Sequence, residues 1–422
     1  MVPIQQLIDL AIVALVALSC GAVLSRLRQP PVVGYILAGV VLGPSVTGFV
    51  RSDDTVALLA ELGVLMLLFV VGMELSLRAF RVVWTTALAA TGLQLALSLG
   101  VMALLSLATG WSPGATVLVG FVVAVSSTAV AFKLLEEVGE LRTHLGRLAV
   151  GVLIAQDLAV VPMLLTLGFF AEGRADLLGL LRLAFAVGLL ALLIIVLTRR
   201  KRVSLALPEA SPQMHADLVP LVALSACFGA AGLAGALGLS PAYGAFLVGL
   251  AIGNSGLRAP MLANTLPIQG VLMMMFFLSI GLLIDFDVVA RHVQTVVLLV
   301  LFITLLKTAI NIGIFRWLKL GWPEAVLVAA VMAQVGEFSF VLAGEAGRLR
   351  LIDEEDYLIL VTVTALSLAV SPAWLEVSRR LHAVIDARRH QIGQLPGRLL
   401  AGLARPPRAG GSADDPVAGG DA

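Results

Sequence analysis

The chain has 422 residues, of which 59% are hydrophobic and only 13% are charged, and its formal net charge is +1. Soluble domains carry about 25% charged residues, so this composition excludes an ordinary soluble protein and indicates one that lies in lipid. The near-neutral charge leaves no basic surface that would bind nucleic acid, and no nucleic-acid partner is expected.

Apolar stretches recur along the chain, and each is long enough to cross a hydrocarbon core roughly 30 Å thick. The first lacks a basic segment before it and is followed by Arg26 and Arg28, so we expect a retained helix and no cleaved signal peptide. Thirteen helices are predicted, in chain order, at Ile4–Leu24, Pro31–Thr47, Val56–Met73, Val82–Leu107, Pro113–Leu135, Leu148–Phe170, Leu177–Leu197, Leu218–Leu237, Pro241–Asn254, Pro267–Ile284, Val288–Phe315, Pro323–Ala346 and Tyr357–Leu381.

One membrane domain, residues 1–390, accounts for nearly the whole chain. Residues 391–422 are rich in Gly, Pro, Ala and Arg, and we expect them to form a disordered tail. The loops after odd-numbered helices carry eighteen Lys and Arg, and the loops after even-numbered helices carry five. The positive-inside rule then predicts a multi-pass protein of a bacterial inner membrane, with its N-terminus in the periplasm and its C-terminus in the cytoplasm.

Residues that bind metals or carry catalysis in enzymes are few and scattered. Cys20 and Cys227 lie singly in apolar stretches, and the five histidines lie in or beside polar loops without the spacing of a zinc site. The sequence offers no pairing of a nucleophile with a base, so an enzyme is the least favoured class and no cofactor is expected.

Four ionisable residues stand out inside the predicted helices, where a charge is costly and marks a functional site by default. Asp157 lies about 13 Å from one end of its helix, at 1.5 Å rise per residue, and cannot reach water. Lys307 and Glu337 also lie near mid-depth, while Glu61 lies closer to a helix end. The alternative for Asp157, Lys307 and Glu337 is a charge network that only holds helices together, and for Glu61 structural and accessory roles are equally open.

Polar residues also lie at the centres of the fifth and twelfth helices, at Ser126–Thr128 and Gln334–Glu337. Both are candidate breaks, because transporters use broken helices to expose backbone groups that coordinate ions. The alternative is an intact helix whose hydroxyls bond to the preceding turn. The two helices are seven apart and therefore run in opposite directions, so we infer an inverted repeat of helices one to six and eight to thirteen, linked by helix seven and Arg199–Asp217.

Several motifs in this order resemble the second cation:proton antiporter family, specifically its Kef-type potassium/proton branch, over about Leu7 to Leu381. The motifs are Glu61-Leu-Gly-Val-Leu-Met-Leu-Leu-Phe with Gly72-Met-Glu-Leu, Ser126-Ser-Thr-Ala, Gln156-Asp157, Gly244-Ala-Phe-Leu-Val-Gly, Phe276-Phe-Leu-Ser-Ile-Gly and Gln334-Val-Gly-Glu-Phe. The resemblance implies an all-α antiporter fold with two crossed broken helices, and a core domain that moves as an elevator against a dimerisation domain, which makes a homodimer the expected state.

The resemblance also implies roles for individual residues. Asp157 matches the aspartate that binds the alkali cation, the only metal expected here, and Gln156 stands where sodium-exporting members often carry a second aspartate. Lys307 matches the basic residue of helix eleven. Ser126, Ser127, Thr128, Gln334 and Glu337 fall in the broken helices. Kef systems carry a nucleotide-binding domain after the last helix, and this chain lacks its Gly-rich motif, so we expect regulation to need a separate subunit or the basic cytoplasmic segments.

A carboxylate in a poorly solvated site is costly to ionise, so a proton and a cation compete for it and exchange follows. Hydroxyls, freed carbonyls and the Gln156 carbonyl would complete the oxygen shell of the cation. With one titrating carboxylate, Asp157, we predict electroneutral exchange of K+ for H+. Na+ in place of K+, and an electrogenic cycle that involves Lys307, stay open, as does a channel-like or sensory protein without obligatory exchange.

Overall fold

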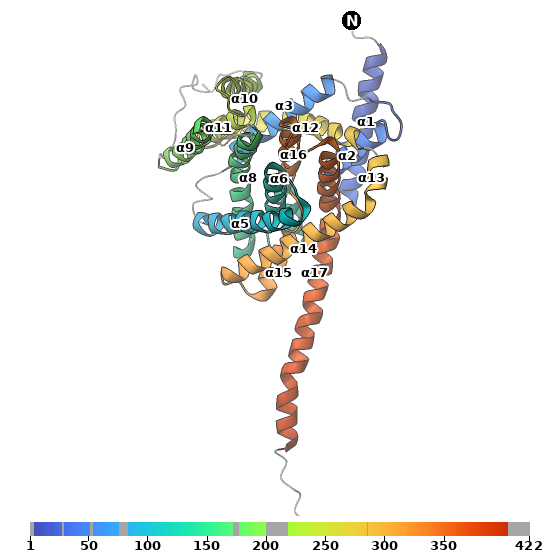
Figure 1. The fold of residues 1–422 in the computed structure, drawn as a ribbon, viewed down its shortest axis with the longest axis vertical. Helices are drawn as coiled ribbons and strands as arrows, with labels where there is room; N and C mark the ends of the chain where they lie inside the picture. The colour runs from blue at the N-terminus through green and yellow to red at the C-terminus, as the bar shows by residue number, and fades with distance from the viewer. Residues whose placement is uncertain are drawn as a thin grey trace, which may run out of the picture. The chain divides into compact units, whose positions relative to one another are not determined.

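The computed structural model describes residues 4–27, 29–50, 54–75, 83–171, 177–199, 218–284 and 286–403 (Figure 1). Within these ranges the regular elements are α-helices, as predicted. Their bounds are α1 (Ile4–Arg26), α2 (Pro31–Leu42), α3 (Asp54–Glu74), α5 (Trp84–Thr109), α6 (Pro113–Ala124), α7 (Thr128–Glu137), α8 (His144–Ala171), α9 (Leu177–Arg199), α10 (Leu218–Ala236), α11 (Pro241–Gly253), α12 (Arg258–Leu283), α13 (Phe286–Arg291), α14 (Val293–Trp317), α15 (Trp322–Val331), α16 (Phe338–Arg348) and α17 (Glu354–Leu403).

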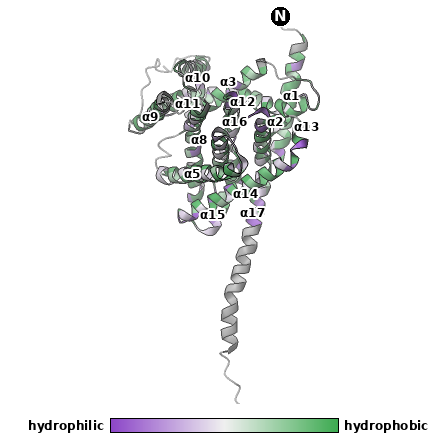
Figure 2. Cartoon of the chain, viewed as in Figure 1, coloured by the Kyte–Doolittle hydropathy of each residue, from purple (hydrophilic) through white to green (hydrophobic). Residues whose placement is uncertain are grey.

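Apolar helices of membrane-spanning length dominate the chain. Among the described residues, nine helices are long and apolar enough to cross a membrane, and four shorter apolar helices lie between them. They correspond in order to the thirteen predicted segments. Hydrophobic residues cover most of these helices (Figure 2), and several remain exposed, such as Leu104 at 70% and Leu107 at 84% on α5. Such side chains suit a lipid surface, so the protein is a multi-pass membrane protein.

Three predicted helices, the second, the tenth and the eleventh, differ from the observed ones because of a local backbone feature. The second helix ends at Leu42, since Gly43 is extended before Pro44. The tenth begins at Arg258 and carries Pro267 in its interior, where membrane helices tolerate proline. The eleventh is divided at His292 into α13 and α14.

The chain divides into two compact units, residues 1–375 and 376–422, and α17 contributes to both. The helix continues to Leu403, so the backbone of residues 391–403 is helical where we predicted a disordered tail. Residues 404–422 of that predicted tail lie outside the described residues.

Helices of the first unit form two groups, which we call the panel group and the core group. The panel group contains α1, α2, α3, α10, α11 and α12, which contact one another extensively. The core group contains α5, α6, α7, α8, α14, α15 and α16. The first part of α17 joins the core group through Trp374, whose Nε1 donates to Thr308 Oγ1 on α14 at 3.0 Å.

The contacts repeat between the two halves of the chain and confirm the inverted repeat. The pair α1–α2 has its counterpart in α10–α11, the pair α3–α11 in α2–α12, and the pair α5–α6 in α14–α15. Close approach at glycine repeats as well. A Cβ at Gly39 on α2 would lie 2.1 Å from the Leu278 carbonyl oxygen of α12, and a Cβ at Gly249 on α11 would lie 2.1 Å from the Phe69 carbonyl oxygen of α3.

Candidate functional site

The first predicted break lies between α6 and α7, at Val125, Ser126 and Ser127. Val125 and Ser127 have extended backbone dihedrals, which end α6 and begin α7 on a new axis. A helix end leaves carbonyls or N–H groups without intrahelical partners. Ser127 caps α7 by accepting a hydrogen bond from Val130 N at 3.3 Å. The predicted break at the polar triplet is therefore confirmed.

The second predicted break is confirmed between α15 and α16, and it crosses the first. Gly336 N donates to Val125 O at 3.1 Å, and Ser126 Oγ donates to Met332 O at 2.8 Å. A Cβ at Gly336 would lie 2.8 Å from both the carbonyl carbon and the carbonyl oxygen of Ser126. Only glycine allows the two broken chains to approach this closely. Helices α6, α8 and α16 lie side by side around the crossing (Figure 1).

Gln156 on α8 holds the first break in place. Its Oε1 accepts from Ser126 N at 2.9 Å, and its Nε2 donates to Ala124 O at 3.1 Å and to Gln94 Oε1 at 2.8 Å. The side chain is 1% exposed. One amide thus satisfies a donor and an acceptor that the broken helix leaves unpaired, and both of its own donors are used.

Two amides that the sequence analysis missed connect the breaks. Gln94 Nε2 on α5 donates to Asn311 Oδ1 on α14 at 2.8 Å, and Asn311 Nδ2 lies 3.4 Å from Met332 O. The chain of contacts Gln156–Gln94–Asn311 therefore runs from the α6 carbonyl end to the α15 carbonyl end. The signal that would have revealed them is an amide within an apolar helix, where an unpaired polar group is costly.

Lys307 on α14 contacts the same break. Its Nζ donates to Val125 O at 2.6 Å, and the residue is only 3% exposed. A cation is favourable at the carbonyl end of a helix because the helix dipole is negative there. Among the described residues no ion pair joins Lys307 to Asp157, so the contact observed is with the broken helix.

Asp157 lies at the opposite end of the crossing and is 7% exposed. Thr128 Oγ1 donates to its Oδ2 at 3.0 Å, while its Oδ1 is buried and has no hydrogen-bond partner within the described part of the chain. The carboxylate interacts electrostatically with Glu337, and more weakly with Glu74 on α3, a residue the sequence analysis did not select.

Glu337 and Gln334 also have unpaired oxygens near the crossing. The Glu337 carboxylate is hydrogen-bonded by the Ser127 side chain, and its Oε2 is buried without a hydrogen-bond partner among the described residues. Gln334 Nε2 donates to Ser127 O at 3.3 Å, and its Oε1 has no such partner there. The predicted residues of both breaks therefore meet around Asp157 in one buried polar cluster.

The carbonyl ends and the N-terminal ends of the two broken helices lie beside different charged and polar side chains. The carbonyl ends of α6 and α15 meet Lys307, Gln156 and Asn311. The N-terminal ends of α7 and α16 begin at Thr128 and Phe338, beside the carboxylates of Asp157 and Glu337. Each sign of helix dipole thus faces the opposite charge.

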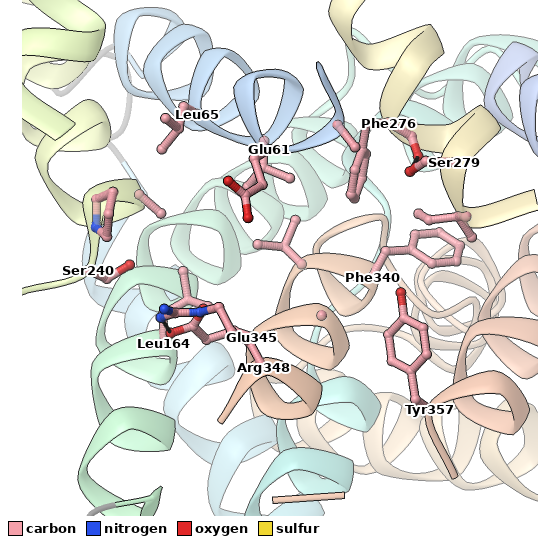
Figure 3. A pocket seen from close by; sticks show the side chains of 17 residues that line it. Glu61, Leu65, Leu164, Ser240, Phe276, Ser279, Phe340, Glu345, Arg348 and Tyr357 are labelled. Atoms are coloured by element: carbon pink, nitrogen blue, oxygen red, sulfur yellow. Dashed lines mark hydrogen bonds and ion pairs between the residues drawn. The ribbon is translucent and has the colours of Figure 1, made fainter. Parts of the chain in front are cut away.

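Glu61 lies away from this crossing, in a cavity of about 470 Å³ between the panel and core groups. Helices α3, α11 and α12 line one wall, and α8, α16 and α17 line the other. Figure 3 shows Glu61 projecting from α3 into the cavity, with Glu345 and Arg348 on the facing wall. Arg348 Nε and Nη2 pair with Glu345 at 2.9 and 2.6 Å, and Arg348 also interacts electrostatically with Glu61.

The cluster is rich in oxygen and poor in the ligands of transition metals. Among the described residues, no group of three or more His, Cys, Asp or Glu side chains is close enough to bind a metal ion together. Hydroxyl, carbonyl and carboxylate oxygens are the ligands that hard cations prefer. The geometry thus suits an ion of the alkali type better than a soft or transition metal.

Comparison with known proteins gives matches along the whole membrane part of the chain. Residues 12–377 match the family described as "Sodium/hydrogen exchanger, transmembrane". The chain is 48% identical over 395 residues to the iron transporter MagA of Paramagnetospirillum magneticum, with 94% of this chain and 91% of that protein covered.

Other relatives are named for potassium. The chain is 32% identical over 373 residues to K(+) efflux antiporter 6 of Arabidopsis thaliana, with 87% of this chain and 62% of that protein covered. It is 30% identical over 420 residues to the glutathione-regulated potassium-efflux system protein KefC of Escherichia coli, with 94% and 66% covered. The chain therefore spans less than two thirds of the length of these two relatives.

A solved structure has the same fold. The sodium proton antiporter MjNhaP1 of Methanocaldococcus jannaschii superposes with a TM-score of 0.63, covering 89% of this chain and 98% of that one. At 15% sequence identity this match concerns the fold alone. It agrees with the predicted antiporter fold of crossed broken helices.

Proposed function

Because this chain belongs to the sodium/hydrogen exchanger family, and to its Kef-type branch, we propose that it exchanges a monovalent cation for protons. The family and the fold are those of transporters rather than enzymes. The observation that carries the proposal is Asp157, a buried carboxylate with one unpaired oxygen at the crossing of two broken helices. A single carboxylate that binds either a proton or a cation is enough for exchange, provided that the protein reorients only when the charge is neutralised.

The cation that we propose is K+, with Na+ as the competing choice. Support comes from relatives named as potassium-efflux proteins and from the Gln156–Asp157 pair. The iron named for the 48% identical relative is a further candidate substrate. Iron sites in proteins usually include imidazole or thiolate ligands. Among the described residues, no group of three or more His, Cys, Asp or Glu side chains could hold a metal ion, which favours an alkali cation over iron.

Electroneutral exchange is the proposed stoichiometry. The Lys307 ammonium is bonded to the Val125 carbonyl oxygen, so its charge balances the end of α6. We propose that Lys307 has a structural role in this contact and is not a proton carrier in the cycle. Its loss would weaken the broken helix without creating a net movement of charge.

Gln156 is better explained as a support for the break than as a cation ligand. Its two donors and its oxygen are already bonded to Ala124, Gln94 and Ser126. We therefore propose that Gln156, Gln94 and Asn311 fix the shape of the crossing. Thr128 positions the Asp157 carboxylate, and Ser126 ties the two breaks to each other.

The cavity between the panel and core groups is the proposed access route. It is lined by residues 60–65 of α3, by the first residues of α11 and α17, by the second halves of α8 and α12, and by residues along α16. The charge partition in the sequence predicts that α3, α11 and α17 begin, and that α8, α12 and α16 end, on the periplasmic side. Movement of the core group past the panel group would close this route and open one on the other side.

The remaining assignments are proposals of the same kind. We propose an inner-membrane protein with a periplasmic N-terminus and a cytoplasmic C-terminus, which functions as a homodimer. Membrane lipid, the transported cation and a second copy of the chain are thus its expected partners.

The function is tested by adding K+, Na+, Rb+, Li+ and Fe2+ in turn to proteoliposomes that contain a pH-sensitive dye. The proposal predicts dye dequenching with K+ and Rb+ for the wild type. It predicts none for Asp157→Asn, although this variant purifies as a folded protein. A channel would pass cations without coupled proton movement, and a response to Fe2+ alone would contradict the choice of a monovalent substrate.

A further inference from the structure

We propose that Glu337 is a second carboxylate ligand of the transported cation, which its Oε2 binds together with Asp157 Oδ1. The inference rests on the proposed function, since it concerns the same site. It goes further by assigning a direct contact to a residue whose expected role was only charge compensation. It also gives a physical reason why the proposed site would bind a monovalent rather than a divalent cation.

The position of Glu337 directs its carboxylate into the crossing. Glu337 is the N-cap residue of α16, but its side chain makes no capping bond to that helix. Its carboxylate instead contacts the Ser127 side chain and the backbone N–H groups of Ala129 in α7 and of Glu337 itself. These contacts leave Oε2 buried without a hydrogen-bond partner among the described residues. Its charge acts directly on Asp157.

Unpaired oxygens of neighbouring buried residues point to a ligand at this place. Within the described residues, Asp157 Oδ1, Glu337 Oε2 and Gln334 Oε1 are buried and have no hydrogen-bond partner. Asp157 and Gln334 are 7% and 1% exposed. Buried polar atoms are nearly always paired, and an unpaired one is destabilising. A cation bound by the two carboxylate oxygens would recover this cost.

The charge balance of the crossing favours a single monovalent ion. Each half-helix end carries about half an elementary charge. The carbonyl ends of α6 and α15 therefore sum to about −1, which Lys307 balances. The N-terminal ends of α7 and α16 sum to about +1 against two carboxylates, which leaves about −1. One alkali ion neutralises this remainder, whereas a divalent ion would leave an excess positive charge.

A purely structural role for Glu337 would require a permanent cationic partner. Lys307 is a buried cation that could serve as such a partner. Its Nζ, however, donates a hydrogen bond to Val125 O at 2.6 Å. Within the described ranges no ion pair includes Glu337. Its contacts with the Ser127 side chain and with the backbone N–H groups of Ala129 and Glu337 orient the carboxylate and include no cationic side chain. The Glu337 carboxylate is therefore free to pair with a transported cation, which binds and dissociates in each transport cycle.

The test compares Glu337→Gln with Glu324→Gln, the same substitution at the exposed end of the same broken helix. Glu324 caps α15, and glutamine also suits that capping position. The measurements are the apparent KM for K+ in proteoliposomes and the rise in melting temperature of the purified protein with K+. The proposal predicts at least a tenfold higher KM and no K+-dependent rise for Glu337→Gln, with both values unchanged for Glu324→Gln.

Unchanged KM and unchanged stabilisation in Glu337→Gln would overturn the proposal. If this variant does not fold, Glu337→Asp decides, because it keeps the charge but withdraws the oxygen by one methylene. If Glu337 binds the cation, Glu337→Asp should raise the KM for K+. If Glu337 does not bind the cation, the KM should equal the wild-type value, and the proposal would be wrong. The wild type and Asp157→Asn are measured in parallel, since failure of exchange in the wild type would refute the proposed function itself rather than the role of Glu337.

Discussion

Replacement of Gln156 by methionine separates the two roles that this side chain could have. The variant keeps the length of the side chain but removes its partners for Ser126 N, Ala124 O and Gln94 Oε1. Each buried group left unpaired costs about 1–3 kcal/mol. The Gln94 side chain keeps its hydrogen bond to Asn311 and can reorient, so only Ser126 N and Ala124 O are counted as unpaired. The free energy of unfolding should then fall by about 2–6 kcal/mol.

That loss is a large part of the stability of a typical protein, about 5–15 kcal/mol. The assay is thermal unfolding of the purified protein, together with the apparent KM for K+ of the fraction that remains folded. We expect a melting temperature lower by several degrees and a KM within about threefold of the wild-type value. Gln269→Met is the matched control. Among the described residues its Nε2 donates a hydrogen bond to Met273 Sδ alone, so removal of this buried amide should change stability by less than about 1 kcal/mol. A normal melting temperature with a greatly raised KM would refute the reasoning and make Gln156 a cation ligand.

Two further predictions concern the crossing itself. Gly336→Ala should reduce exchange at least tenfold and lower the melting temperature, because its Cβ would lie 2.8 Å from the Ser126 backbone, which has no room to move. Wild-type activity in dye-based flux assays would contradict the close approach of the breaks. Lys307→Met should lower the melting temperature, since Val125 O loses a 2.6 Å bond, but should leave exchange electroneutral. Recordings on solid-supported membranes should detect no sustained current in either protein, and a wild-type current that disappears in Lys307→Met would make the lysine part of the cycle.

The sequence predicts the fold well because lipid imposes strong constraints on a chain. A span needs a minimum apolar length, which nine of the described helices meet, and the four shorter helices could still be located as apolar stretches between polar residues. The breaks were predictable for the same reason, since Ser126–Thr128 and Gln334–Glu337 interrupt otherwise apolar helices. Errors at Pro267 and His292 arose because tertiary packing in a membrane tolerates prolines and bends that local rules treat as boundaries.

The site was only partly predictable, because a sequence gives the depth of a residue but not its direction. Lys307 and Asp157 have similar depths, yet Lys307 contacts the Val125 carbonyl oxygen. Gln94 and Asn311 were missed because neutral amides stand out less than charges in a hydropathy pattern. Their importance follows from hydrogen bonds between helices that are far apart in the sequence.

The central claim is that a proton and a cation compete for Asp157. It is tested most directly by measuring the apparent KM for K+ in proteoliposomes at a series of pH values, with the same pH on both sides. Competition predicts that KM rises as the pH falls, that saturating K+ overcomes this inhibition by protons, and that Asp157→Asn shows no exchange at any pH. A KM independent of pH, or exchange that persists in Asp157→Asn, would contradict the account.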